Sequence, residues 1–315
     1  MLLREVEYAR PSSVEEAIEL LAGHEGARAL AGGQTIVNVM KARAASPDVL
    51  VDLNRLDELR SISVSGETLQ LGAMATYTQI MASSEVEVSR PILAEVAAQI
   101  ADVQVRNRGT IGGNICSNDP TNHLPPLLVA LDASMTVRGA GGDRTVAASD
   151  FFLGVYMTAV GEGELLLSVS VPAAANAADG FASVTIGRDG TCLANAAACL
   201  AGDSGRVALG CVDAVPVLLT PTSSDESSVR QAVQAAGIDP PADVHASSDY
   251  RRHLAEVVAD EVDEQAPCVD VALVPLAVDL DRDRPARRGL LHAHRPRSAA
   301  CCTARAAQTA ARWRR

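Results

Sequence analysis

The amino-acid sequence predicts an α+β protein with two domains and a C-terminal extension. Its 315 residues are 48% hydrophobic, which supplies enough apolar side chains for two cores. Apolar residues recur at helical spacing in some segments, and in others they form short runs bounded by glycine or proline. A small, polar run at 173–180 indicates a linker between the domains.

The first predicted elements lead into a glycine turn. A capping box at 13–16 predicts a helix over 12–23. Residues 27–31 predict a short buried strand, which runs directly into Gly32-Gly33-Gln34-Thr35. Helical spacing then extends over 36–43. The local order is therefore strand, glycine turn and helix start.

Extended and helical segments alternate through the next 60 residues. Residues 48–53 follow a proline and predict a strand, and 61–65 with 68–73 flank a Ser-Gly pair as a hairpin. Residues 76–83 and 91–102 predict helices, the second of which begins at a proline.

The stretch 105–118 lacks both periods and contains three glycines among polar residues, so we expect a tight loop. Residues 133–138 alternate and precede a glycine-rich turn at 139–142, which predicts a strand. Another strand is predicted at 165–171, ending at Pro172.

The region after the linker predicts a compact α+β unit. It combines three strands, at 181–186, 193–200 and 207–212, with helices near 226–236 and 248–262.

Residues 266–315 lose this patterning. Their Arg/Ala/Pro bias is typical of a flexible, solvated tail, of a basic arm or of out-of-frame GC-rich coding sequence. Residues 282–315 carry ten Arg and a single acid, whereas the whole chain has a net charge of −12. That net charge disfavours nucleic acid or an anionic membrane as a partner.

The N-terminus and the cysteines indicate a reducing, cytoplasmic location. The chain opens with charged residues instead of an apolar signal segment, and no apolar run reaches the roughly 18 residues that a membrane span needs. None of the seven cysteines forms the spacings that hold zinc or iron-sulfur clusters, so any cluster must come from another subunit. We expect no metal site in this chain.

Two glycine motifs carry the candidate chemistry. Ala31-Gly32-Gly33-Gln34-Thr35 and Thr110-Ile111-Gly112-Gly113-Asn114 lie far apart in the sequence, yet both remove side chains where an anion could approach the backbone. A diphosphate needs several N–H donors in a concave arrangement, and the two Thr hydroxyls could add to them. Neither GxGxxG after a strand nor GxxxxGK[ST] occurs, which argues against a nicotinamide Rossmann domain and a P-loop.

The sequence resembles the flavoprotein subunit of molybdenum hydroxylases, a family that includes carbon monoxide dehydrogenase medium subunits and the FAD domain of xanthine dehydrogenases. The segments that carry the resemblance are ALAGGQTIVNVMKAR, SPDVLVDLNRL, VRNRGTIGGNICSNDPTNHLPPLLVALDA, SDFFLG and GELLLSVSVP. They cover about residues 1–200 in the family's order, and the resemblance continues weakly to about 265.

The resemblance implies a two-subdomain FAD-binding fold of the vanillyl-alcohol-oxidase or PCMH type, followed by a smaller α+β domain. The FAD-binding domain would span 1–175, with subdomains of about 1–55 and 56–175. The C-terminal domain of the carbon monoxide dehydrogenase flavoprotein type would span 176–265, before the unpatterned tail.

The resemblance also implies the cofactor site. The diphosphate of FAD would lie on both glycine motifs, Ser117 would stand at a hydroxyl position after the second motif, and Leu166 would pack against the isoalloxazine ring. Relatives usually carry an acid where this chain has His123, so that contact is open. Arg188 is the nearest basic residue to a Lys that often reaches the flavin. The cofactor-binding residues expected are Leu30, Ala31, Gly32, Gly33, Gln34, Thr35, Ile36, Thr110, Ile111, Gly112, Gly113, Asn114, Ser117, His123, Leu166 and Arg188.

The implied role is electron transfer with no catalytic residue in this chain. A large subunit would hold the molybdopterin cofactor and a small subunit two [2Fe-2S] clusters, in a heterotrimer or a dimer of heterotrimers. Electrons would pass through FAD to NAD, a quinone or oxygen. Two other functions remain open, a self-contained oxidase of the vanillyl-alcohol-oxidase type and a flavin-free scaffold that docks partners.

Overall fold

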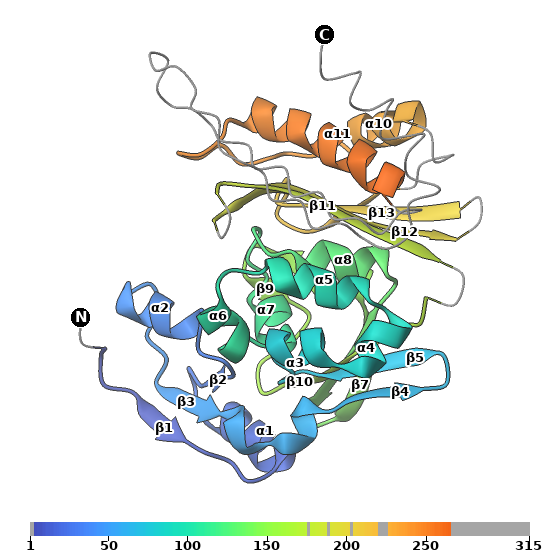
Figure 1. Ribbon diagram of the computed structural model, residues 1–315. Coiled ribbons are helices and arrows are strands. Elements are labelled where there is room, and N and C mark those ends of the chain that lie inside the picture. Colours follow the sequence, from blue (N-terminus) through green and yellow to red (C-terminus); the bar gives the residue numbers. More distant parts are fainter. Residues whose placement is uncertain (1–2, 175–176, 188–189, 202–203, 220–225, 266–315) are drawn as a thin grey trace. The chain divides into compact units, whose positions relative to one another are not determined.

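The computed structural model describes residues 3–174, 177–187, 190–201, 204–219 and 226–265, and it confirms a mixed α and β architecture (Figure 1). Its sheets have three, five, four and two strands. In the described part of the chain, no helix is both long and apolar enough to cross a membrane. The tail 266–315 and Arg188 lie outside the described residues.

The N-terminal sheet is parallel, with the strand order β1-β3-β2. All four residues of β3 are buried because helix α1 packs against this central strand. The strand over 27–31 is confirmed, but its predicted burial is wrong: β2 lies at the sheet edge, with two of its three residues exposed. The elements are β1 (Glu7–Ala9), α1 (Val14–Gly23), β2 (Arg28–Leu30), α2 (Ile36–Lys41), β3 (Val49–Asp52) and the 3-10 helices η1 (Leu53–Arg55) and η2 (Asp57–Arg60).

The second sheet is antiparallel, with the order β4-β5-β10-β6-β7. The predicted hairpin is confirmed, since Ser65 pairs with Thr68 across a turn in which Gly66 has a φ of 60°. The strands are β4 (Ile62–Ser65), β5 (Thr68–Gly72), β6 (Ser134–Gly139), β7 (Gly142–Ala147) and β10 (Leu165–Pro172).

Helices pack against this sheet, and apolar side chains of the helices and of the sheet form one hydrophobic core. Two of them, α6 and α7, adjoin α3 and β10 respectively. The elements are α3 (Tyr77–Ala82), α4 (Ser84–Ser89), α5 (Ile92–Gln99), α6 (Val103–Arg108), α7 (Ile111–Ser117), α8 (Leu124–Ala130), α9 (Ala148–Phe151) and the hairpin strands β8 (Phe152–Gly154) and β9 (Met157–Thr158).

The third sheet is antiparallel and covered on both faces. Helix α11 packs on β11 and β12 from one side, while α8 contacts β12 and β13 from the other, as Figure 1 shows. The elements are β11 (Ala178–Thr185), β12 (Cys192–Ala201), β13 (Ser204–Gly210), β14 (Val217–Leu219), α10 (Glu226–Ala235) and α11 (Ser248–Gln265). The start of β11 within 173–180 shows that the predicted linker was too long.

The segment 105–118 is not a loop, so that prediction was wrong. It forms α6 and α7, separated by two residues. Asp102 accepts from an amide in the first turn of α6, and Thr110 does the same for α7. Ile111 and Ile115 of α7 are fully buried. Capping and burial therefore outweigh the low helix propensity of adjacent glycines.

Candidate functional site

The first glycine motif lies at the carboxyl end of the parallel sheet. It follows β2 and leads into α2, next to the end of β3. Gly33 has a φ of 75°, a conformation that side chains disfavour, so glycine is required for this turn. Ligands of sheets with parallel strands commonly bind at this edge.

The backbone amides of this turn are free to donate. Within the described chain, the N–H groups of Gly33, Gln34, Thr35 and Ile36 make no hydrogen bond to a protein acceptor. The first helical bond runs from Val37 N to the carbonyl oxygen of Gly33. Successive unbonded amides in a turn make an anion-binding concavity.

A polar network fixes this turn to the sheet. The side-chain nitrogen of Asn54 donates to the carbonyl oxygen of Ala31 at 2.9 Å and to Asp52 Oδ1 at 2.6 Å. The Tyr8 hydroxyl donates to Asp52 Oδ2. Burial alone would raise the pKa of the Asp52 carboxyl, but hydrogen bonds from Tyr8 and Asn54 outweigh burial and hold that pKa below its usual range. Asp52 therefore stays ionised and keeps Asn54 oriented toward Ala31.

The second glycine motif forms the N-terminal half of α7, and its amides are already used. Four consecutive N–H groups donate to protein oxygens: Ile111 to the Ala75 carbonyl at 3.0 Å, Gly112 to the Ala73 carbonyl at 2.9 Å, Gly113 to Thr110 Oγ1 at 3.0 Å and Asn114 to the Thr110 carbonyl at 3.0 Å. The Thr110 hydroxyl thus serves as the helix cap, and the amides of Ile111 to Asn114 are not free to bind an anion.

The two motifs are adjacent in space, as the sequence predicted. A Cβ atom placed on Gly32 would lie 2.0 Å from the carbonyl oxygen of Arg108, which is two residues before Thr110. A Cβ atom on Gly113 would lie 3.8 Å from that of Ala31. Gly32 is therefore needed for the contact between the motifs, whereas Gly33 is needed for the turn itself.

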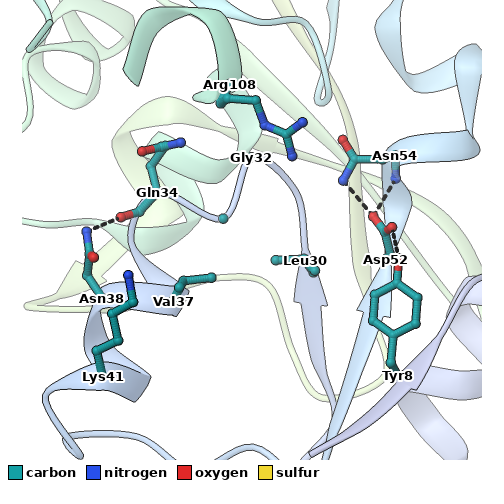
Figure 2. A pocket seen from close by; sticks show the side chains of 11 residues that line it. Tyr8, Leu30, Gly32, Gln34, Val37, Asn38, Lys41, Asp52, Asn54 and Arg108 are labelled. Carbon is teal, nitrogen blue, oxygen red and sulfur yellow. Dashed lines mark hydrogen bonds between the residues drawn. The ribbon is translucent and has the colours of Figure 1, made fainter. Parts of the chain in front are cut away.

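A cleft of about 500 Å³ opens beside the first motif (Figure 2). That volume lies within the range of small-molecule sites. Two cationic side chains, Lys41 and Arg108, line it together with the Asp52 network. The full lining is Tyr8, Leu30, Gly32, Gly33, Gln34, Val37, Asn38, Lys41, Asp52, Asn54 and Arg108.

Sequence reasoning missed seven residues of the cleft: Tyr8, Val37, Asn38, Lys41, Asp52, Asn54 and Arg108. One signal was available: Asp52 and Asn54 stand at the end of a buried strand next to the glycine turn, where parallel sheets present ligand-binding residues. The position of Arg108 depends on the contact of α6 with Gly32, and it could not be predicted because residues 105–118 were expected to form a loop.

The remaining predicted residues lie elsewhere. The Ser117 hydroxyl donates to the Asn114 carbonyl at 2.7 Å, within α7. His123 is 8% exposed, its ring centroid is 5.4 Å from that of Phe181, and burial lowers its pKa to about 4. Leu166 is 3% exposed in the core of the second sheet. None of these three lines the cleft.

One polar atom near the second motif lacks a partner. Asn114 is 9% exposed, and its Oδ1 atom accepts no hydrogen bond from the described chain. The neighbouring Tyr77 hydroxyl is buried, which raises its pKa to about 12, while a hydrogen bond with Asn114 acts in the opposite direction. A buried carbonyl oxygen without a donor is uncommon in proteins and marks a place where a ligand could donate.

Comparison with known proteins identifies the family. Residues 4–174 match the family described as the FAD binding domain in molybdopterin dehydrogenase. The carbon monoxide dehydrogenase medium chain of Hydrogenophaga pseudoflava is 47% identical over 169 residues, which span 53% of this chain and 58% of that one. Subunit alpha of the 6-hydroxypseudooxynicotine dehydrogenase complex of Paenarthrobacter nicotinovorans is 33% identical over 91% of this chain and 98% of its own length.

Comparison with solved structures supports the same family. Carbon monoxide dehydrogenase from Hydrogenophaga pseudoflava superposes with a TM-score of 0.80 at 35% identity, covering 84% of this chain and 98% of that chain. Quinoline 2-oxidoreductase from Pseudomonas putida 86 gives the same TM-score at 33% identity with the same coverage. The chain therefore belongs to the FAD-binding domain family of molybdopterin dehydrogenases, as an oxidoreductase flavoprotein subunit of the molybdenum hydroxylase type.

Proposed function

We propose that this chain takes electrons from [2Fe-2S] clusters of a partner subunit and passes them through FAD to an external acceptor. The observation that best supports the proposal is the cleft beside the first glycine motif, where unbonded amides lie near Lys41 and Arg108. Amides and cations together favour an anion such as the diphosphate of FAD.

The residues present fit this cofactor. The turn 33–36 offers N–H donors, and Asn114 offers a buried acceptor for a hydroxyl or an N–H group. Bound flavin would supply the capacity to accept electrons singly and release them in pairs. The protein's part is to hold and orient the cofactor, since the cleft contains no acid–base pair: its one carboxylate, Asp52, is engaged by Tyr8 and Asn54.

The wider set of cofactor contacts belongs to the same proposal. We assign the diphosphate to the first motif with its flanks, Leu30 to Ile36, against the surface formed by Thr110 to Asn114. Ser117, His123, Leu166 and Arg188 are proposed to lie toward the flavin ring.

The proposed complex has three kinds of subunit. Relatives bear names such as medium chain and complex subunit alpha, which supports a multi-subunit assembly. We propose a large subunit with the molybdopterin cofactor and a small [2Fe-2S] subunit as partners, in a heterotrimer or a dimer of heterotrimers. The acceptor would be NAD, a quinone or oxygen, and the location would be the cytoplasm.

The test is to purify the chain with the subunits encoded beside it and to record flavin absorbance and its bleaching under anaerobic conditions. The proposal predicts one FAD per chain and bleaching that requires the iron-sulfur subunit when the complex is given its reducing substrate. A colourless protein would favour the docking scaffold. Flavin that is reduced directly by an alcohol, without partners, would favour the self-contained oxidase.

A further inference from the structure

Two arginines of α6 have different surroundings, although they are only two residues apart. Arg106 donates to the carbonyl oxygens of Ile100 at 3.0 Å and Ala101 at 2.5 Å, so its guanidinium closes the turn before the helix. The Arg108 side chain makes no hydrogen bond or ion pair within the described chain. It lines the cleft instead, and Figure 2 shows its guanidinium directed into the space between Gly32 and Asn54.

The backbone fixes where Arg108 stands. Its carbonyl oxygen occupies the place that a Cβ atom on Gly32 would need, at 2.0 Å, so the end of α6 abuts the first glycine turn. The next residues along that turn carry the unbonded amides of Gly33 to Ile36. The guanidinium therefore borders the same cleft as Gly33 and Gln34, and in the described part of the chain neither the guanidinium nor these two amides donate to a protein acceptor.

The charges in the cleft favour an anion with two negative charges. Lys41, the last residue of α2, is a second cation in the lining and makes no ion pair in the described part of the chain. The one carboxylate there, Asp52, is matched by Arg10 at 3.8 Å and by the hydrogen bonds from Tyr8 and Asn54. Two cations thus remain for a ligand. A guanidinium can meet phosphate oxygens through two parallel N–H bonds, which a lysine cannot do.

We propose that Arg108, assisted by Lys41, binds the diphosphate of the dinucleotide, opposite the amides of the first glycine turn. This inference rests on the proposed binding of FAD and adds two cationic side chains to the cofactor site. The cleft then distinguishes ligands by their diphosphate: FAD and ADP share this group, whereas riboflavin and adenosine lack it.

The experiment uses the full-length chain after removal of flavin, with titrations of FAD, ADP and adenosine. The variants are Arg108→Ala, Arg108→Lys and Lys41→Ala, with Arg55→Ala as a control for charge, because Arg55 is exposed on η1 and does not line the cleft. Thermal unfolding of each variant without ligand checks the fold, in which the Arg108 side chain makes no hydrogen bond or ion pair with the residues that the structure describes.

We expect Arg108→Ala to weaken FAD and ADP about 10- to 100-fold, the effect of losing a charged bidentate contact, and Lys41→Ala to weaken them by less. Arg108→Lys should recover part of the loss, and the Arg55→Ala affinities should stay within about threefold of the unaltered chain. Adenosine binding should not change.

Three results would overturn the inference. Arg108→Ala could bind ADP as tightly as the unaltered chain does, which would show that Arg108 does not contact the diphosphate. It could lose adenosine and ADP equally, which would place the guanidinium on the base. The unaltered chain could also bind neither FAD nor ADP, in which case the proposed function fails first and this inference with it.

Discussion

The two glycine motifs look alike in sequence but are used differently in the fold. The first has a left-handed glycine and four amides that find no acceptor among the described residues, next to a cleft. The second is the start of a capped helix in which the four amides from Ile111 to Asn114 donate to protein oxygens and Ile111 is fully buried. Paired glycines therefore do not by themselves indicate an anion site. The acceptors available to their amides decide the matter.

Each region also depends on the other. The first motif is placed by Asn54 on one side and by the end of α6 on the other, through the contact between Gly32 and Arg108. The second motif provides a rigid surface for that contact. Substitutions in the first should therefore mainly change cofactor affinity, and those in the second should mainly change the free energy of unfolding.

The largest effect is expected for Gly33→Val. A branched side chain disfavours a φ of 75°, so the turn should rearrange and withdraw its amides. Loss of two charged hydrogen bonds, at about 1.5–3 kcal/mol each, predicts at least a roughly hundredfold loss of FAD affinity. Flavin per purified chain measures it. Gly113→Val belongs to the second motif and should chiefly lower the free energy of unfolding, because its Cβ atom would lie 2.9 Å from Thr110 Oγ1, the cap of α7.

Gly66→Val is the matched control, since Gly66 has a φ of 60° in an open hairpin turn away from the cleft. It should carry similar backbone strain and retain its flavin. Full flavin content in Gly33→Val would remove the first turn from the site.

A second prediction concerns the pH dependence of the free energy of unfolding, which should differ for His123 and Asp52. Burial depresses the folded-state pKa of His123, beyond the second motif, from about 6.5 to about 4. The unfolded chain therefore binds a proton at His123 before the folded chain does. The free energy of unfolding should be highest above pH 6.5 and should fall by up to about 3 kcal/mol as the pH is lowered toward 4. The depressed pKa of Asp52 places its loss at lower pH, below about 3.8. Urea unfolding between pH 7 and 4.5 measures the difference.

His123→Gln should flatten the dependence over that window, because the amide does not titrate. An identical loss of stability in the variant and the unaltered chain would show that other groups cause the acid sensitivity.

A third prediction concerns packing of the second motif. A Cβ atom on Gly112 would lie 2.6 Å from the Ala73 carbonyl oxygen and 2.8 Å from the Ala73 Cβ. Gly112→Ala should therefore lower the free energy of unfolding by about 1–3 kcal/mol. The control is Gly141→Ala, where a Cβ atom meets nothing within 4 Å. Equal stability of the two variants would mean that α7 can shift freely.

The smallest effects come from the two threonines. Thr110 caps α7, so Thr110→Ala should cost about 1 kcal/mol of stability. Thr35 makes no side-chain cap bond, so Thr35→Ala should leave stability within about 0.5 kcal/mol and weaken FAD binding a few-fold. Denaturant unfolding and FAD titration of both variants give the comparison. A loss of stability in Thr35→Ala together with a loss of FAD affinity in Thr110→Ala would contradict the roles assigned to the two motifs.

The sequence predicted most long elements but not the geometry of the site. Capping boxes, prolines and the Ser-Gly turn located α1, α5, β10 and the hairpin of β4 and β5 within a few residues. Local signals failed where tertiary contacts decide, as in α6 and α7, and for short elements such as β1, α4, β7, β8, β9 and β14. Helix α8 was not predicted, although its prolines stand in the first turn, where proline is tolerated.

The site shows the same division. The residues of both motifs and their proximity could be predicted, because the resemblance fixes their order and pairing. The amide acceptors could not, since Ala73 and Ala75 lie in a strand connection far from Thr110 in sequence. The placement of Arg108 against Gly32 likewise arises only when α6 packs against the first turn.

Hydrogen exchange of the backbone amides, with and without FAD, tests the central claim most directly. The account predicts rapid exchange over residues 33–36 in the flavin-free chain and strong protection there when FAD is bound. Residues 111–114 should be protected in both states, because their hydrogen bonds belong to the fold. Protection that appears on FAD binding at 111–114 and not at 33–36 would contradict it.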